Sequence, residues 1–129
     1  MLEKSFNYWG LRFMKFIGIS RVFSLVNEDQ YNTIGAFWDE LALLYGLENL
    51  KGLGYNWNGN FMEYAIGLKD GIIEGYNVEI ELPNYNWKIV KGKTDNLKNI
   101  YDEIYKNGSL IYEIETFNEN GECLIKYYR

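Results

Sequence analysis

The chain has 129 residues, a length that suits one domain and leaves little room for two independent cores. Hydrophobic residues make up 47% and charged residues 24%, a globular composition that excludes intrinsic disorder. The formal net charge of −5 repels a phosphate backbone, so we expect no direct contact with nucleic acid. The longest uncharged run, Gly52–Met62, is shorter than the roughly 20 apolar residues of a membrane helix. We expect no membrane association and, because charges interrupt every early apolar stretch, no signal peptide and a cytoplasmic location.

Two residue types that carry much of protein chemistry are missing or nearly so. The chain has no histidine, the commonest general base and a frequent metal ligand. Cys123 is the single cysteine, which excludes an intramolecular disulfide and a cysteine cluster for zinc or iron–sulfur. We therefore expect no metal, haem or other cofactor. Aromatic residues, in contrast, make up 18% of the chain, more than a small core requires.

Apolar periodicity predicts a strand, a helix and a hairpin in the first half of the chain. Residues Phe13–Val26 are rich in β-formers and predict a strand that bends at Gly18. Apolar residues then recur at helical spacing over Ile34–Tyr45, and the glycines that follow should end this helix. Two short apolar runs between residues 53 and 68 flank Asn58-Gly59, which predicts a hairpin with a type I′ turn.

The second half contains the same order of elements after one additional strand. Period-two alternation over Tyr76–Leu82 predicts that additional strand, which Pro83 should end. The remaining predicted elements are a strand over Tyr85–Lys91, a helix over Leu97–Tyr105 with a cap at Thr94 or Asp95, and two strands, Leu110–Phe117 and Glu122–Tyr128.

The repeated order predicts an α+β fold. We expect two pseudo-symmetric strand-helix-strand-strand units that form a mostly antiparallel sheet, with two helices on one face and a ligand cleft between the helices. We assign residues 13–129 to this single domain and residues 1–12 to an N-terminal arm of unknown role.

Several stretches occur in the order that a known family has them. They are Phe16–Arg21, Phe37–Leu41, Gly52–Tyr55 with Glu63–Leu68, Pro83–Trp87, and Glu115–Phe117. Over residues 13–128 the chain resembles the GyrI-like effector-binding domain, the ligand-sensing module of many AraC-type and MerR-type multidrug-responsive regulators. Residues 1–12 match nothing in that pattern. No helix-turn-helix is present, so the resemblance implies that a DNA-binding domain or partner protein would lie elsewhere.

The candidate counter-charge for a ligand is Glu115. Strand alternation places Glu115 on one face with Ile111, Glu113 and Phe117. If the helices cover that face, an unpaired carboxylate there costs several kcal/mol or has a raised pKa, and a cationic ligand would neutralise it. The pattern alone also allows the reverse, with both glutamates in water. The resemblance favours an inward Glu115, whereas we expect Glu113 at the surface.

Aromatic side chains are the candidate walls of the cleft, although core packing explains most of them equally well. Helical stripes carry four of them, and Tyr55 and Trp57 are expected to share one face of the hairpin. Ring faces attract cations, so these side chains suit a cationic aromatic ligand. The predicted ligand-binding residues are Glu115, Phe37, Trp38, Tyr55, Tyr64, Trp87, Tyr101, Tyr105 and Phe117.

Two function classes remain open. In the first, the domain binds a cationic, aromatic, amphipathic small molecule and carries out no reaction. In the second, the chain resembles those family members that hydrolyse electrophilic cyclopropane-bearing compounds. Glu115 would then orient or deprotonate a water and Tyr64 would donate a hydrogen bond to the developing anion. Family membership alone does not choose between them.

Overall fold

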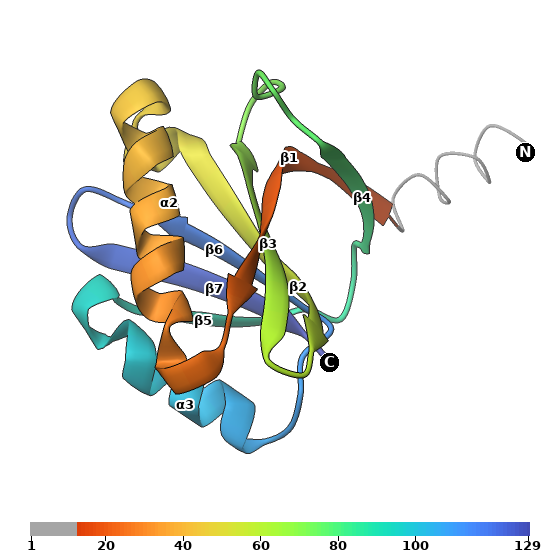
Figure 1. The fold of residues 1–129 in the computed structure, drawn as a ribbon, viewed down its shortest axis with the longest axis vertical. Helices are drawn as coiled ribbons and strands as arrows, with labels where there is room; N and C mark the ends of the chain where they lie inside the picture. The colour runs from red at the N-terminus through yellow and green to blue at the C-terminus, as the bar shows by residue number, and fades with distance from the viewer. Residues whose placement is uncertain (1–12) are drawn as a thin grey trace, which may run out of the picture.

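The computed structural model describes residues 13–129, which form a seven-stranded sheet with two helices packed against one face (Figure 1). The strands are β1 (Phe13–Ser24), β2 (Leu50–Asn58), β3 (Phe61–Leu68), β4 (Val78–Pro83), β5 (Lys88–Lys93), β6 (Tyr112–Phe117) and β7 (Glu122–Tyr128). The helices are α2 (Gln30–Tyr45) and α3 (Leu97–Lys106). The predicted α+β class is confirmed. The predicted arm over residues 1–12 lies outside the described residues.

The sheet consists of two equivalent halves. Its strand order is β4-β1-β3-β2-β6-β7-β5, and every described neighbouring pair is antiparallel. The first unit is β1, α2, β2 and β3, the second is β5, α3, β6 and β7, and β4 is the additional strand at one edge. The units meet where β2 pairs with β6, from Gly52 opposite Glu115 to Tyr55 opposite Tyr112. The predicted repeat is therefore present, and its junction runs through the middle of the sheet.

Several element boundaries differ from the sequence prediction. Helix α2 begins at Gln30, before the predicted start. Strand β5 begins at Lys88, later than predicted, and Asn86 just before it has a φ of 63°. In the β2–β3 hairpin, Asn58 still pairs with Phe61 and Gly59 has a φ of 62°. A glycine at the first position of a two-residue loop is typical of a type II′ turn, so the predicted type I′ turn is wrong.

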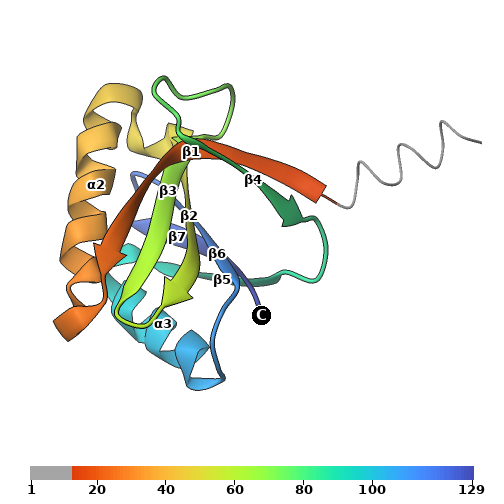
Figure 2. The same cartoon turned by 45° about the vertical axis from the view of Figure 1, so that its right-hand side comes forward.

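Strand β1 changes partner at Gly18, where we predicted a bend. Residues Phe13 to Gly18 pair with β4, and Ile19 to Ser24 pair with β3. A Cβ atom on Gly18 would lie 2.6 Å from the carbonyl oxygen of Ile66, and one on Gly67 would overlap the carbonyl oxygen of Ile17. The close approach of these two strands thus requires both glycines. Figure 2 shows β4 and the first half of β1 leaning out from the rest of the sheet.

Each face of the sheet has its own apolar cluster. The larger cluster lies between the helices and the sheet and includes Phe37, Trp38, Tyr64, Tyr101 and Ile125. The smaller cluster lies on the opposite face, where Phe16 of β1 and Leu82 of β4 pack with residues of β2 and β6. Within residues 13–129, no helix is long and apolar enough to cross a membrane.

The close approach of β1 and β3 at Gly18 and Gly67 gives a first prediction. Gly67→Ala should destabilise the fold by about 1–3 kcal/mol, because the new methyl group must displace the backbone of β1. Gly35→Ala is the matched control, since Gly35 lies inside α2 and its Cβ would meet nothing within 4 Å. That change should stabilise the fold by roughly 0.4–1 kcal/mol. Urea unfolding of both variants measures the two effects, and equal stability of the two variants would refute the crossing argument.

Candidate functional site

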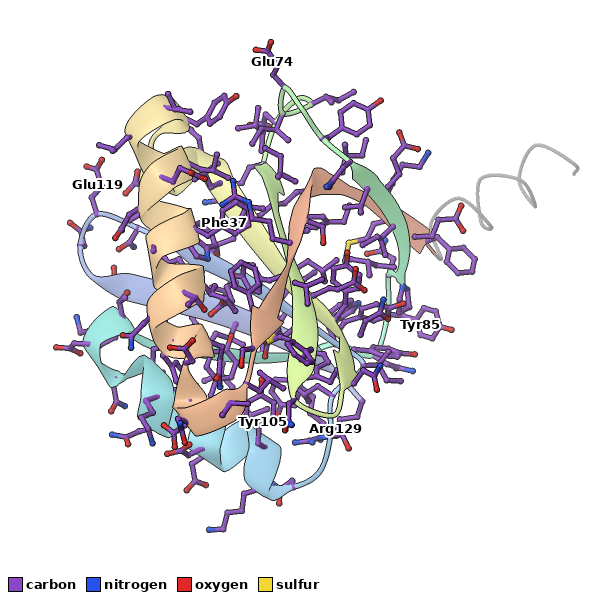
Figure 3. All side chains as sticks on the ribbon, viewed as in Figure 1. Phe37, Glu74, Tyr85, Tyr105, Glu119 and Arg129 are labelled. Atoms are coloured by element: carbon purple, nitrogen blue, oxygen red, sulfur yellow. The ribbon has the colours of Figure 1, made fainter. Side chains whose placement is uncertain are left out.

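The two helices and the inner face of the sheet enclose a cavity of about 620 Å³. This volume lies within the roughly 300–1,000 Å³ typical of small-molecule sites. Side chains from both helices and from the strands reach into the space between these elements (Figure 3). The wall is mostly apolar and aromatic and includes Leu25, Tyr31, Ile34, Trp38, Leu47, Trp57, Met62, Tyr64, Leu97, Tyr101, Tyr105 and Phe117.

All the charged side chains that line this cavity are acidic. They are Asp39, Glu113, Glu115 and Glu119, and the described lining residues include no lysine or arginine. Asp39 and Glu119 are exposed, whereas Glu113 and Glu115 are only 5% and 4% exposed. The cavity therefore holds two buried carboxylates without a cationic partner from residues 13–129.

Glu115 is held by aromatic donors from three elements. The Tyr64 hydroxyl of β3 donates to Oε1, and the Tyr101 hydroxyl of α3 donates to Oε2 at 2.7 Å. Trp38 of α2 donates its Nε1–H to the Tyr64 hydroxyl at 2.9 Å. The Trp38 ring also meets Phe117 edge to face, with centroids 4.8 Å apart. The expectation that Glu115 faces the helices is confirmed.

Glu113 is buried beside Glu115, so the expectation that it lies at the surface is wrong. It accepts a hydrogen bond from the Tyr105 hydroxyl at 2.9 Å, and the Tyr105 ring stacks on Tyr101 with centroids 5.7 Å apart. The reason is strand alternation: β6 is regular from Tyr112 to Phe117, so an inward Glu115 requires an inward Glu113. The intervening Ile114 points to the cluster on the opposite face.

Two glycines on β2 make the space for these carboxylates. Gly52 lies opposite Glu115 and Gly54 lies opposite Glu113 in the β2–β6 pairing. A Cβ atom on Gly54 would lie 2.7 Å from Glu113 Oε1, and one on Gly52 would overlap the Tyr64 hydroxyl. Gly52 and Gly54 therefore leave room beneath the side chains of Tyr64 and Glu113, whereas Leu53 between them belongs to the opposite cluster.

Burial dominates the electrostatics of the site. It raises the pKa of Glu113 well above the ordinary value, and the neighbouring charge of Glu115 adds to that effect. Burial also raises the pKa of Glu115, although the hydrogen bonds from Tyr64 and Tyr101 act in the opposite direction. The pKa values of Tyr64, Tyr101 and Tyr105 are raised, mainly by burial, so these tyrosines remain neutral donors. Burial raises the pKa of Tyr31 to about 12.

Three predicted ligand-binding residues lie outside the cavity. Phe37 packs on Phe23 with ring centroids 5.8 Å apart. The Arg21 guanidinium lies over the Phe37 ring, 4.2 Å from the ring centroid. Tyr55 and Trp87 belong to the cluster on the opposite face of the sheet. The Tyr55 hydroxyl bonds to Ser20 Oγ at 2.6 Å, and Trp87 donates to the Pro83 carbonyl at 2.6 Å. The remaining predicted residues, Trp38, Tyr64, Tyr101, Tyr105, Glu115 and Phe117, all line the cavity.

A β-bulge explains why Tyr55 and Trp57 do not share a face, as we predicted. The β2–β3 register shifts between Tyr55 and Asn58, and Asn56 has a φ of 51°. One additional residue in a strand reverses the direction of the side chains beyond it. Tyr55 therefore packs in the cluster of the outer face, whereas Trp57 lines the cavity.

The sequence prediction missed Tyr31 and Trp57 as cavity residues. Tyr31 has a usable signal, because it lies three residues before Ile34 and seven before Trp38 and thus extends the same helical stripe. Trp57 has none, because no residue pattern indicates the bulge at Asn56.

Comparison with known proteins places this fold. No protein-family model matches the chain, and no curated protein matches it. The solved structure of SAV2435 bound to tetraphenylphosphonium is similar over 90% of this chain and 88% of that one, with a TM-score of 0.64 and 12% identity. A candidate bacterial transcription regulation protein from Staphylococcus aureus MU50 is similar over 92% of this chain and 97% of that one, with a TM-score of 0.56 and 14% identity. The chain therefore shares its fold with these two proteins. At these identities the likeness concerns the fold alone.

The raised pKa of Glu113 predicts a pH-dependent stability. The folded chain binds a proton at Glu113 more tightly than the unfolded chain does, so folding stability should fall as the pH rises above the ordinary carboxyl pKa. Glu113→Gln keeps an acceptor for Tyr105 and removes this charge. The variant should be more stable than the parent at neutral pH, and the difference should shrink toward pH ~4, where the unfolded carboxyl is also protonated.

Urea unfolding at several pH values measures this difference. Glu81→Gln on β4 is the control, because Glu81 is exposed and lies outside the cavity. A Glu113→Gln effect that stays constant across the pH range would contradict the titration argument.

Proposed function

We propose that the cavity binds a bulky organic cation and that Glu115 is its principal counter-charge. The observation that carries this proposal is the pair of buried carboxylates whose described partners are neutral tyrosine hydroxyls. A hydrogen bond from a neutral donor stabilises a carboxylate but leaves its net charge uncompensated. A cation in the cavity would supply that compensation.

The cavity wall indicates what kind of cation fits. The wall includes the rings of Trp38, Trp57 and Tyr105 together with aliphatic side chains. Such a surface favours an apolar, aromatic ligand. A ring face adds roughly 0.5–2 kcal/mol of attraction for a positive charge within about 6 Å. The similar fold of SAV2435 was solved with tetraphenylphosphonium, a cation that carries four phenyl rings and no hydrogen-bonding group. A ligand of that class suits the cavity described here.

The tyrosines around Glu115 act as positioning residues. Tyr64 and Tyr101 come from β3 and α3, so together they fix the carboxylate between the sheet and a helix. Because both hydroxyls are already directed at the carboxylate, little reorganisation is needed when a cation arrives. Ligand binding should also lower the raised pKa of Glu115 and thereby favour release of any proton held there.

We further propose that this binding serves ligand sensing in transcription regulation, or sequestration of a drug-like compound. One structural neighbour is described as a candidate transcription regulation protein, which supports the first use. DNA recognition would then require another segment or a partner protein, and the cytoplasmic location stays a prediction. The two neighbours are described as a ligand-bound protein and a candidate regulator, so they lend no support to the hydrolase alternative.

The substitution Glu115→Gln tests the proposal. It preserves the shape of the side chain and removes its charge, so tetraphenylphosphonium should bind more weakly by roughly 1.5–3 kcal/mol, the range for a charge-assisted contact. Calorimetry measures the affinity, and quenching of Trp38 at the cavity wall reports occupancy. The fold should be as stable as the parent or more so, since one buried charge is gone.

Two controls separate a specific contact from a general charge effect. Glu81→Gln makes the same charge change at an exposed position of β4 and should leave the affinity unchanged. The neutral ligand triphenylphosphine oxide should bind the parent and Glu115→Gln equally. If the parent does not bind tetraphenylphosphonium, or if Glu81→Gln weakens binding as much as Glu115→Gln does, the proposal is wrong.

A further inference from the structure

A second concave site lies on the face of the sheet that the helices do not cover. It is a groove of about 220 Å³ between the leaning β1–β4 ribbon and the outer faces of β2, β6 and β7. Its floor is apolar and consists of Met14, Phe16, Leu82, Ile114 and Leu124, with Thr116 beside them. We call this site the outer groove. It shares no lining residue with the cavity under the helices.

The charge of the outer groove is opposite to that of the cavity. Its described lining includes Lys15, Lys51, Lys69 and Lys126 and no aspartate or glutamate. This concentration of positive charge is notable in a chain whose formal net charge is −5. Lys15 forms an ion pair with Glu79 at 3.8 Å. For Lys51, Lys69 and Lys126, the described part of the chain provides no carboxylate within ion-pair distance.

Lys51 shows how the lysines and the apolar floor meet. Its Nζ lies 5.0 Å from the centroid of the Phe16 ring, and its side chain is half-buried. Burial lowers the pKa of Lys51, although the charge of Asp70 acts in the opposite direction. Lys126, also half-buried, lies opposite Ile114 in the β6–β7 pairing. The Lys51 ammonium is thus partly withdrawn from water at the edge of an apolar surface, and Lys126 adds a second positive charge to the same groove.

We propose that the outer groove binds a small organic anion with an apolar body, such as an aromatic sulfonate or carboxylate. The apolar floor would take the body, and Lys51, Lys69 and Lys126 would pair with the anionic group. The volume is below the roughly 300–1,000 Å³ of sites for drug-sized ligands, so a ligand of one or two rings fits better than a larger one. An anion beside Lys51 also compensates a half-buried charge, which makes its contact stronger than one at a fully exposed lysine.

The two sites are independent because they use opposite faces of the same strands. On β2, Lys51 lines the outer groove, whereas the next residue, Gly52, faces the cavity residues Tyr64 and Trp38. On β6, Ile114 lines the outer groove and Glu115 lines the cavity. An organic anion is repelled by the acidic cavity, and an organic cation is repelled by the lysines. Ligand charge therefore selects the site.

Naphthalene-2-sulfonate is a suitable probe. It is titrated into the 129-residue chain, and calorimetry measures its affinity. Binding should be saturable, and the neutral analogue naphthalene-2-sulfonamide should bind more weakly. Lys51→Gln and Lys126→Gln should each weaken sulfonate binding by about three- to tenfold. The matched control is Lys98→Gln on α3, whose ammonium pairs with Glu28 and Asp102 on the other side of the sheet. This control should leave the sulfonate affinity unchanged.

Five results would overturn the proposal. Equal losses from Lys51→Gln and Lys98→Gln would show a response to overall charge and not to a site. Competition by saturating tetraphenylphosphonium, or stronger sulfonate binding in Glu115→Gln, would place the probe in the cavity. Equal affinity for the sulfonate and the sulfonamide, or no saturable binding, would show that the lysines do not recognise an anion. Apart from the competition test, which requires tetraphenylphosphonium to bind in the cavity, each result is independent of whether the cavity binds cations.

Discussion

The structure around the cavity depends on the burial of Glu113 and Glu115 on one face of β6. Isolated ionised carboxylates are among the costliest groups to remove from water, so their surroundings must compensate. Three tyrosine hydroxyls, from β3 and α3, donate to these carboxylates. Gly52 and Gly54 on β2 leave the space that the carboxylates and Tyr64 occupy. The helices, the tyrosines and the glycines are therefore constrained by the same two side chains.

The sheet separates two chemically different surfaces, and strand alternation is the cause. Successive residues point to opposite faces, so one stretch of β2 or β6 contributes to both. On the helix-covered face, the charged groups on β6 are carboxylates, and aromatic rings line the same cavity. On the other face, lysines surround an apolar floor that the bent β1 and β4 complete. The bend depends on Gly18 and Gly67, so residues that do not line either site shape the second one.

Regular periodicity made most of the fold predictable, and single irregular residues account for the errors. The helical stripe that begins at Ile34 is a property of regular backbone, and its residues Phe37, Trp38 and Leu41 are buried as predicted, whereas Leu44 is 73% exposed. Alternation in β6 placed Glu113 and Glu115 on one face but left open which face is inward. The bulge at Asn56 depends on a positive φ, which the sequence of β2 does not reveal, and it exchanged Tyr55 for Trp57 at the cavity. For Glu113 the prediction was wrong because regular alternation puts it on the same face as Glu115, so an inward Glu115 does not permit an exposed Glu113.

Glu115 is hydrogen-bonded by tyrosines and not by arginine or lysine, and this difference connects the stability of the fold with the charge of the proposed ligand. An arginine beside a buried carboxylate would neutralise it within the folded chain and leave nothing for a cation to compensate. Tyrosines whose pKa values are raised by burial stay neutral, so they hold the carboxylate in place without cancelling its charge. Under the proposed function, a bound cation would relieve the electrostatic penalty of burying these carboxylates. The same penalty, which lowers the stability of the folded chain, would then become part of the free energy of ligand binding.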